Sequence, residues 1–260
     1  MAELAYIGKQ ETQNVDGLAR AMGEARYVCD MRVPGMLIAK ALRSPLPHAR
    51  IAHLDVTPAL QVPGVIAAIT HADFEEHSNF GWPIKDAYAL AYERVRHVGE
   101  AIAVVAAETE AAALAGVAAI ELTLEPLPIV SDMHRALDPD APVIPQGSPT
   151  GKGNLCDVSI LRNGDPAPIL AKCPVILDEH YHTPHQEHVY LETEGALAIP
   201  EPDGGVTVFS NNQSPFINRD IVATLTGLLP EQVRVIQPPI GGTFGGKDDV
   251  LYQTSAQVAR

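Results

Sequence analysis

The sequence predicts an α+β fold made of two domains. Apolar or alternating runs typical of short strands recur along the chain. An apolar strand, an alanine-rich helix and a second strand follow one another between residues 101 and 124. A stretch rich in proline and glycine, with little periodicity, then runs from Pro126 to Asn154. We therefore expect a first domain over residues 1–130, a linker over 131–155 and a mixed α/β domain over 156–260.

In the first half, apolar runs and alternating residues predict strands, and alanine-rich or proline-initiated stretches predict helices. The expected strands cover 35–42, 51–56, 65–70, 101–107 and 120–124, and the expected helices cover 58–60 and 108–119. The tight strand, helix, strand order at the end implies a crossover unit. Between Phe74 and Tyr92 the pattern dissolves, which predicts a long surface loop that carries the only tryptophan, Trp82.

The second half begins with a segment from His180 to Ile199 that we expect to form a strand, a bend and a strand. A strand over 206–210 follows, and Ser214 with Pro215 has the pattern of a helix start. The apolar stripe of this helix ends near Gly227, and a short strand over 233–236 leads into a glycine-rich loop. Residues after 250 have a helical pattern.

Composition restricts the class of protein. The chain has 260 residues and a net charge of −14, which argues against binding to nucleic acid. It contains no run of about 18 apolar residues that could span a membrane, and no secretory signal is recognisable. Cys29, Cys156 and Cys173 are too far apart for a C-x-x-C metal site or a disulfide framework. We expect a cytoplasmic protein whose iron–sulfur clusters, if it uses any, lie on other chains.

The segment from His180 to His188 holds four histidines and raises the alternative of a zinc site. No H-E-x-x-H pattern is present, and Pro184 prevents the helical presentation that such a motif needs. We therefore expect no protein ligand to a metal in this chain.

The most informative stretch is Gly241-Gly-Thr-Phe-Gly-Gly-Lys-Asp248, which follows the strand over 233–236. Glycines allow a backbone to approach an anion closely and to adopt positive φ. Gly241, Gly246 and Lys247 fit part of a Walker A pattern, but Asp248 occupies the place of the Mg²⁺-binding Ser or Thr. The dinucleotide fingerprint also fails, because Thr243 occupies the position of its second glycine. A phosphate loop that binds nucleotide remains an alternative.

This stretch resembles the glycine-rich loop of the molybdopterin subunit in the xanthine dehydrogenase and aldehyde oxidase family. Four further segments resemble successive landmarks of that family's α/β hammerhead domain, namely Arg43–Ile51, Pro63–Val65, Val98–Val105 and Leu124–Pro128. The segment Tyr181–Glu194 is most similar to the split bacterial xanthine- or nicotinate-type dehydrogenases. The resemblance implies a hammerhead domain followed by the N-terminal part of a molybdopterin-binding domain.

The resemblance also implies an activity: hydroxylation of an N-heterocycle or an aldehyde with oxygen from water. It implies a molybdopterin-type cofactor, in its cytosine dinucleotide form, and 2Fe–2S and FAD groups on partner subunits. The residues expected to face the cofactor are Gln213, Gly242, Thr243, Phe244, Gly245 and Gly246. Phe244 and Asp248 are expected to contact substrate. Asp is shorter than the Glu common in purine-oxidising members, which argues against xanthine itself.

The family's general base, a glutamate, lies far downstream of residue 260, and neither Glu192 nor Glu194 lies in a motif that supports this role. The resemblance therefore implies either a split subunit, completed by a chain that carries the C-terminal half of the molybdopterin domain, or a truncated product. A noncatalytic fragment that only binds a partner is the remaining alternative.

Overall fold

The computed structural model describes residues 14–74, 79–81, 85–145, 153–248 and 250–260. The chain divides into two compact units. The first unit contains residues up to Pro128 together with Tyr190–Arg260, and the second contains Ile129–Val189. The domain boundaries expected from the sequence stay a prediction. None of the helices in the described ranges is long and apolar enough to cross a membrane.

The first sheet of unit 1 has the strand order β1-β5-β3, with β1 at Ile38–Arg43, β5 at Ala101–Ala107 and β3 at Val65–Ile69. Both pairings are antiparallel. Helix α2 (Glu110–Ala119) packs against all three strands, and the Thr109 hydroxyl accepts a hydrogen bond from the amide of Ala112 at its start. Gly116 allows this close packing, since a Cβ there would lie 2.8 Å from Cγ1 of Val105.

The second sheet has the order β4-β2-β6, with β4 at Arg94–Val95, β2 at Ala49–Asp55 and β6 at Glu121–Pro126. All pairings are again antiparallel. Strands β5 and β6 flank helix α2, yet they belong to different sheets. The predicted strand, helix and strand between residues 101 and 124 are confirmed. The expectation that they form a crossover unit is wrong, because the two strands do not share a sheet. The helix connects two sheets, which sequence periodicity does not distinguish.

The prediction of a surface loop between Phe74 and Tyr92 is wrong for its described residues. Phe74, Phe80 and Leu90 are buried, and Tyr88, Ala89 and Ala91 are buried with them. Trp82 lies outside the described residues. This segment has little regular structure because it fills space between elements, and its apolar residues follow no strand or helix period.

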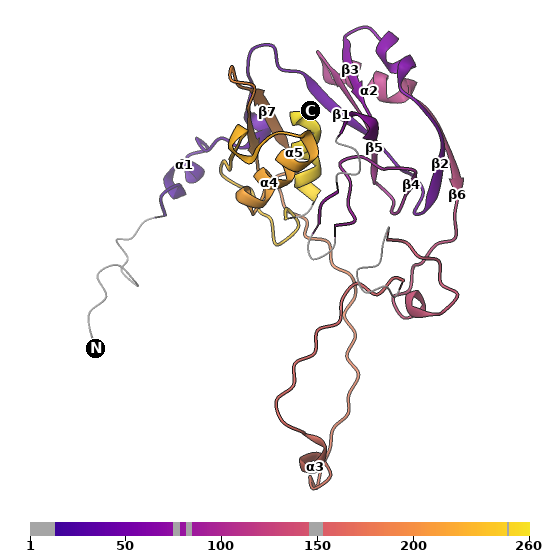
Figure 1. Cartoon of the computed structure of the whole chain (residues 1–260). Helices are drawn as coiled ribbons and strands as arrows, with labels where there is room; N and C mark the ends of the chain where they lie inside the picture. The colour runs from indigo at the N-terminus through magenta and orange to yellow at the C-terminus, as the bar shows by residue number, and fades with distance from the viewer. Residues whose placement is uncertain (1–13, 75–78, 82–84, 146–152, 249) are drawn as a thin grey trace, which may run out of the picture. The chain divides into compact units, whose positions relative to one another are not determined.

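The third sheet contains β7 (Ala196–Pro200), β8 (Val206–Ser210) and β9 (Val233–Ile236) in that order. Strand β8 pairs antiparallel with β7 and parallel with β9. Helix α4 (Pro215–Thr226) connects β8 to β9 and ends at Gly227, whose φ of 76° is the left-handed value typical of a helix end. Helix α5 (Val250–Ala259) packs against α4 and β7 (Figure 1).

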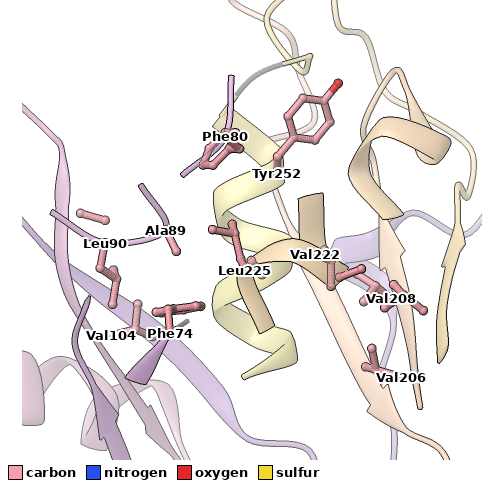
Figure 2. Close-up of a cluster of buried hydrophobic side chains, with 14 residues drawn as sticks. Phe74, Phe80, Ala89, Leu90, Val104, Val206, Val208, Val222, Leu225 and Tyr252 are labelled. Atoms are coloured by element: carbon pink, nitrogen blue, oxygen red, sulfur yellow. The ribbon is translucent and has the colours of Figure 1, made fainter. Parts of the chain in front are cut away.

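One hydrophobic cluster joins side chains from α4, α5 and β8 to those of the 74–90 segment and β5 (Figure 2). Val222 and Leu225 of α4 pack there with Val208, and the rings of Phe80 and Tyr252 meet edge to face. The Gln257 side chain donates a hydrogen bond of 2.6 Å to the carbonyl of Ala89. Side chains from the two sequence segments of unit 1, before Pro128 and after Tyr190, thus share one core. Short elements complete this unit: α1 (Gly17–Ala21) and the 3₁₀ helices η1 (Val28–Asp30), η2 (Thr57–Gln61), η3 (His71–Asp73) and η5 (Pro230–Gln232).

In its described residues, unit 2 contains the two short helices η4 (Arg135–Leu137) and α3 (Ala167–Leu170). Residues 156–189 are all exposed, and α3 lies at the turn between two extended segments (Figure 1). The predicted strand over the start of the 180–199 segment is wrong, since residues 180–190 have no regular structure. Its second part is confirmed as β7.

Candidate functional site

The glycine-rich loop begins after β9 and contains a tight turn. The amide of Gly246 donates a hydrogen bond of 2.8 Å to the carbonyl of Thr243, which closes a four-residue turn. The two central residues, Phe244 and Gly245, have φ values of 51° and 97°. Positive φ at both central positions is the pattern of a type I′ turn.

Phe244 combines two unusual properties within this turn. It adopts a left-handed conformation that is unfavourable for a bulky residue, and 75% of its surface is exposed. Backbone strain of this kind costs about 1–3 kcal/mol and concentrates at functional sites. The turn thus presents an aromatic ring to the surroundings of the loop.

Glu192 anchors the start of the loop. Its Oε2 atom accepts a hydrogen bond of 2.8 Å from the amide of Gly241, and its own amide donates to the Gly241 carbonyl over 3.2 Å. A Cβ at Gly241 would lie 2.5 Å from Cβ of Glu192, so only glycine fits here. Segment 190–195 and the loop therefore lie directly against each other.

Lys247 anchors the end of the loop and is completely buried. Its Nζ atom lies 3.0 Å from Oε2 of Glu192 and 4.8 Å from the centre of the Tyr190 ring. A Walker A lysine must reach the phosphates of a nucleotide. Because Lys247 is enclosed and paired, the geometry does not support the phosphate-loop alternative.

Gln213 lies beside the loop, three residues after the end of β8. Its backbone amide donates a hydrogen bond of 3.2 Å to the carbonyl of Lys247, and its side chain is exposed. Asn211, two residues earlier, is buried and fixes the 193–195 segment, because its Nδ2 donates to the carbonyl of Thr193 and its Oδ1 accepts from the amide of Gly195. Gln213, the loop and segment 190–195 thus form one hydrogen-bonded assembly.

Asp248 follows the loop and is partly buried. Its Oδ1 atom accepts hydrogen bonds from the hydroxyls of Ser214, at 2.9 Å, and Tyr252, at 2.7 Å. Ser214 precedes α4 as expected, but its side chain makes no capping bond to that helix. The hydroxyl instead links the start of α4 to the end of the loop.

The structure brings together all the residues predicted to face the cofactor, since Gln213 and the glycine loop are adjacent. It adds Glu192, Asn211 and Tyr252, which the sequence did not single out as site residues. Their roles depend on contacts across long sequence separations. Glu192 lies in the polar stretch Glu192-Thr-Glu194, and nothing in the sequence distinguishes it from its neighbour Glu194.

Among the described residues, no group of three or more His, Cys, Asp and Glu side chains could hold a metal ion. The histidines between 180 and 188 are exposed, and Nδ1 of His188 lies 3.6 Å from Oε1 of its neighbour Glu187. The three cysteines are free and exposed. This arrangement gives no support to a zinc site.

Two family models match the chain in succession. The aldehyde oxidase and xanthine dehydrogenase a/b hammerhead domain matches residues 22–128, and the molybdopterin cofactor-binding domain matches residues 149–260. The chain belongs to the xanthine dehydrogenase and aldehyde oxidase family. This confirms the resemblance and the predicted fold class, a hammerhead domain followed by part of a molybdopterin-binding domain.

Relatives in this family agree with the assignment. The chain is 36% identical to a probable xanthine dehydrogenase subunit of Bacillus subtilis, over 96% of this chain and 33% of the relative. It is 35% identical to the nicotinate dehydrogenase large molybdopterin subunit of Eubacterium barkeri, over 95% of this chain and 57% of that subunit. The crystal structure of quinoline 2-oxidoreductase from Pseudomonas putida matches with a TM-score of 0.77 and 28% identity, over 91% of this chain and 31% of that one. The chain therefore spans a third of the first of these curated relatives and little more than half of the second.

Proposed function

We propose that this chain contributes the loop side of the cofactor site in a molybdenum hydroxylase of the xanthine dehydrogenase type. The observation that carries the proposal is the hydrogen bond between the amide of Gln213 and the carbonyl of Lys247. It joins the exposed glutamine and the strained glycine loop, which are the two segments expected to face the cofactor. The molybdopterin cofactor, in its cytosine dinucleotide form, would supply two-electron oxidation of a carbon with oxygen from water.

The residues of the loop fit such a group. Gly242 and Gly245 both have φ of 97°, so their backbone adopts a conformation that a side chain would strain. The tip of the turn and the Gln213 side chain are exposed, so both are accessible to a ligand. In the proposed site the side-chain amide of Gln213 donates a hydrogen bond to the cofactor. Gly242, Thr243, Gly245 and Gly246 line it, and Phe244 borders the space for substrate.

The proposed substrate is an N-heterocycle or an aldehyde. The names of two relatives, nicotinate dehydrogenase and quinoline 2-oxidoreductase, support the first class. Asp248 is proposed to border the substrate. Since its Oδ1 already accepts bonds from Ser214 and Tyr252, a substrate would share the carboxylate with these hydroxyls.

We further propose that the protein acts in a complex. The partners would be a polypeptide that carries the rest of the molybdopterin domain with its general base, an iron–sulfur subunit with 2Fe–2S clusters and an FAD subunit. The exposed residues of unit 2 support the first partner, since Leu161, Val175 and Leu177 expose 98%, 73% and 82% of their surfaces. The proposed location is the cytoplasm, in agreement with three free cysteines.

The test is to purify the tagged chain from its native host and to measure molybdenum content and the intact masses of everything that co-purifies. Stoichiometric molybdenum, with a second chain that carries the remaining molybdopterin domain, would support the proposal and justify a screen of N-heterocycles and aldehydes. A chain that comes down with a partner but without metal would instead favour a noncatalytic role in binding. Turnover by the isolated chain would contradict the need for a partner.

A further inference from the structure

Two charged residues of the site are placed too deep to meet a ligand. Lys247 is fully buried, and the Glu192 side chain is 6% exposed. They lie 55 residues apart in sequence and form an ion pair of 3.0 Å. Taking two charges out of water is costly, and an apolar pair of similar volume often stabilises a fold at least as well. The pair therefore calls for a role other than stability.

The contacts of the pair indicate what that role is. Glu192 holds Gly241 through its side chain and its backbone, and so fixes the first residue of the glycine loop. Lys247 is the last residue of the loop, and its carbonyl accepts the hydrogen bond from the Gln213 amide. The ion pair thus closes the loop on itself and connects it to Gln213 through the backbone of Lys247.

A further detail supports a positional role. The Oε1 atom of Glu192 is buried and has no hydrogen-bond partner among the described residues. Buried polar atoms are normally hydrogen-bonded, so an oxygen without a partner adds to the cost of burying this carboxylate. The carboxylate is oriented with Oε2 toward Gly241 and Lys247, which fixes the distance between the two ends of the loop.

We propose that Glu192 and Lys247 are positioning residues that hold Gln213 and the Phe244 turn in a fixed relationship. The pair acts through Gly241 at one end of the loop and through the Lys247 carbonyl at the other. The consequence for the cofactor rests on the proposed function, whereas the consequence for the loop itself does not.

Hydrogen exchange in the protein as purified, with whatever chains accompany it, tests the inference. Glu192→Gln keeps the volume and an acceptor for the Gly241 amide but removes the charge. The decisive amide is the backbone amide of Gln213, because it donates to the carbonyl of Lys247, the ion-pair partner of Glu192. In this variant its exchange is expected to be about tenfold faster, and that of Gly241 also faster, as expected for a local opening. Lys247→Met is the second variant and is expected to have the same effect.

The matched control is Glu100→Gln. Glu100 is also buried and pairs with Arg96 at 3.2 Å, in the connection between β4 and β5. This variant is expected to leave exchange at Gln213 unchanged. Faster exchange at Gly241 alone would overturn the inference, because it would show only the loss of a local contact. A uniform increase throughout unit 1, equal to that of Glu100→Gln, would overturn it as well.

A second readout addresses the cofactor. In a preparation that contains molybdenum, the Mo(V) electron paramagnetic resonance spectrum of Glu192→Gln is expected to differ from that of the wild type, and the spectrum of Glu100→Gln to match it. An unchanged spectrum in both variants would contradict a positioning role toward the cofactor. Absence of molybdenum from the wild-type preparation would contradict the proposed function but leave the exchange result valid.

Discussion

Nζ of Lys247 and Oε2 of Glu192 lie 3.0 Å apart in the interior, and this pair joins the end of the glycine loop to the segment before β7. Lys247→Met removes one partner and leaves a buried, uncompensated carboxylate. Breaking such a pair typically costs about 3–5 kcal/mol of unfolding free energy. Urea denaturation followed by circular dichroism would measure this loss.

The double variant Glu192→Gln/Lys247→Met is the control for this prediction. It removes both charges, so its loss of stability is expected to be smaller than that of Lys247→Met alone. A double variant less stable than the single one would contradict the view that the unpaired charge is what destabilises the fold.

Replacement of Phe244 tests whether its ring is exposed at the turn or packed against the protein. Phe244→Gly relieves the left-handed strain while it removes little packing, since the side chain is mostly exposed. We expect the unfolding free energy to stay equal or to rise by about 1 kcal/mol, which is the scale of this strain. The control is Phe216→Ala, which removes another exposed ring, 71% accessible, from a helix with ordinary backbone geometry. A large loss of stability in Phe244→Gly would show that the ring is packed rather than presented.

The elements of the fold could be predicted because each has its own periodicity or end signal. The apolar runs of β5 and β8 and the αL glycine at position 227 are local features of the sequence. The burial of Phe74 and Leu90 could not be predicted, since it depends on side chains of α4 and α5 that lie more than half the chain away. The two strands β5 and β6 belong to different sheets, and this too depends on pairing with strands far away in the sequence.

The site shows the same division. The glycine loop is a local motif, and its likeness to a family singled out Gln213 and Phe244 together. The structure then shows why Lys247 cannot serve as a phosphate ligand, because Glu192 and Tyr190 enclose it. A buried ion pair between residues 55 positions apart has no signature in one sequence.

Gly241 offers a test of the close contact between the loop and segment 190–195. In Gly241→Ala the new Cβ would lie 2.5 Å from Cβ of Glu192, and the loop must move. We expect a loss of about 1–3 kcal/mol of unfolding free energy, typical of overpacking. In Gly17→Ala the new Cβ lies 3.3 Å from Cβ of Asn14 in an exposed segment, so little change is expected. Equal effects of the two substitutions would contradict the contact.

The reactivity of Cys29 is expected to depend on pH in a specific way. Desolvation raises the pKa of the Cys29 thiol, and the negative charges of Asp30 and Glu192 raise this pKa further. Since the thiolate is the reactive form, alkylation should reach half of its maximal rate at a pH above the ordinary thiol value near 8.5. Rates would be measured with iodoacetamide in a Cys156→Ser/Cys173→Ser background. Asp30→Asn should move the profile to lower pH, and an unchanged profile would contradict the electrostatic contribution of Asp30.

Asp248 connects the glycine loop to two helices, because its Oδ1 accepts hydrogen bonds from Ser214 before α4 and from Tyr252 within α5. Asp248→Ala removes the acceptor of both hydroxyls, and hydrogen bonds to a charged group contribute about 1.5–3 kcal/mol each. Asp248→Asn retains a carbonyl oxygen in the same place, so its loss of unfolding free energy is expected to be clearly smaller.

The control for this comparison is Asp220→Ala, which removes an exposed carboxylate that lies 2.7 Å from Arg219 on α4. Exposed ion pairs contribute about 0–1 kcal/mol, so this variant is expected to unfold close to the wild-type midpoint. The order Asp220→Ala, Asp248→Asn, Asp248→Ala in increasing loss would identify the carboxylate as a structural acceptor at the loop. If Asp248→Ala were as stable as Asp220→Ala, the two hydroxyl contacts would contribute nothing to the fold, and the view of Asp248 as a structural acceptor would be contradicted.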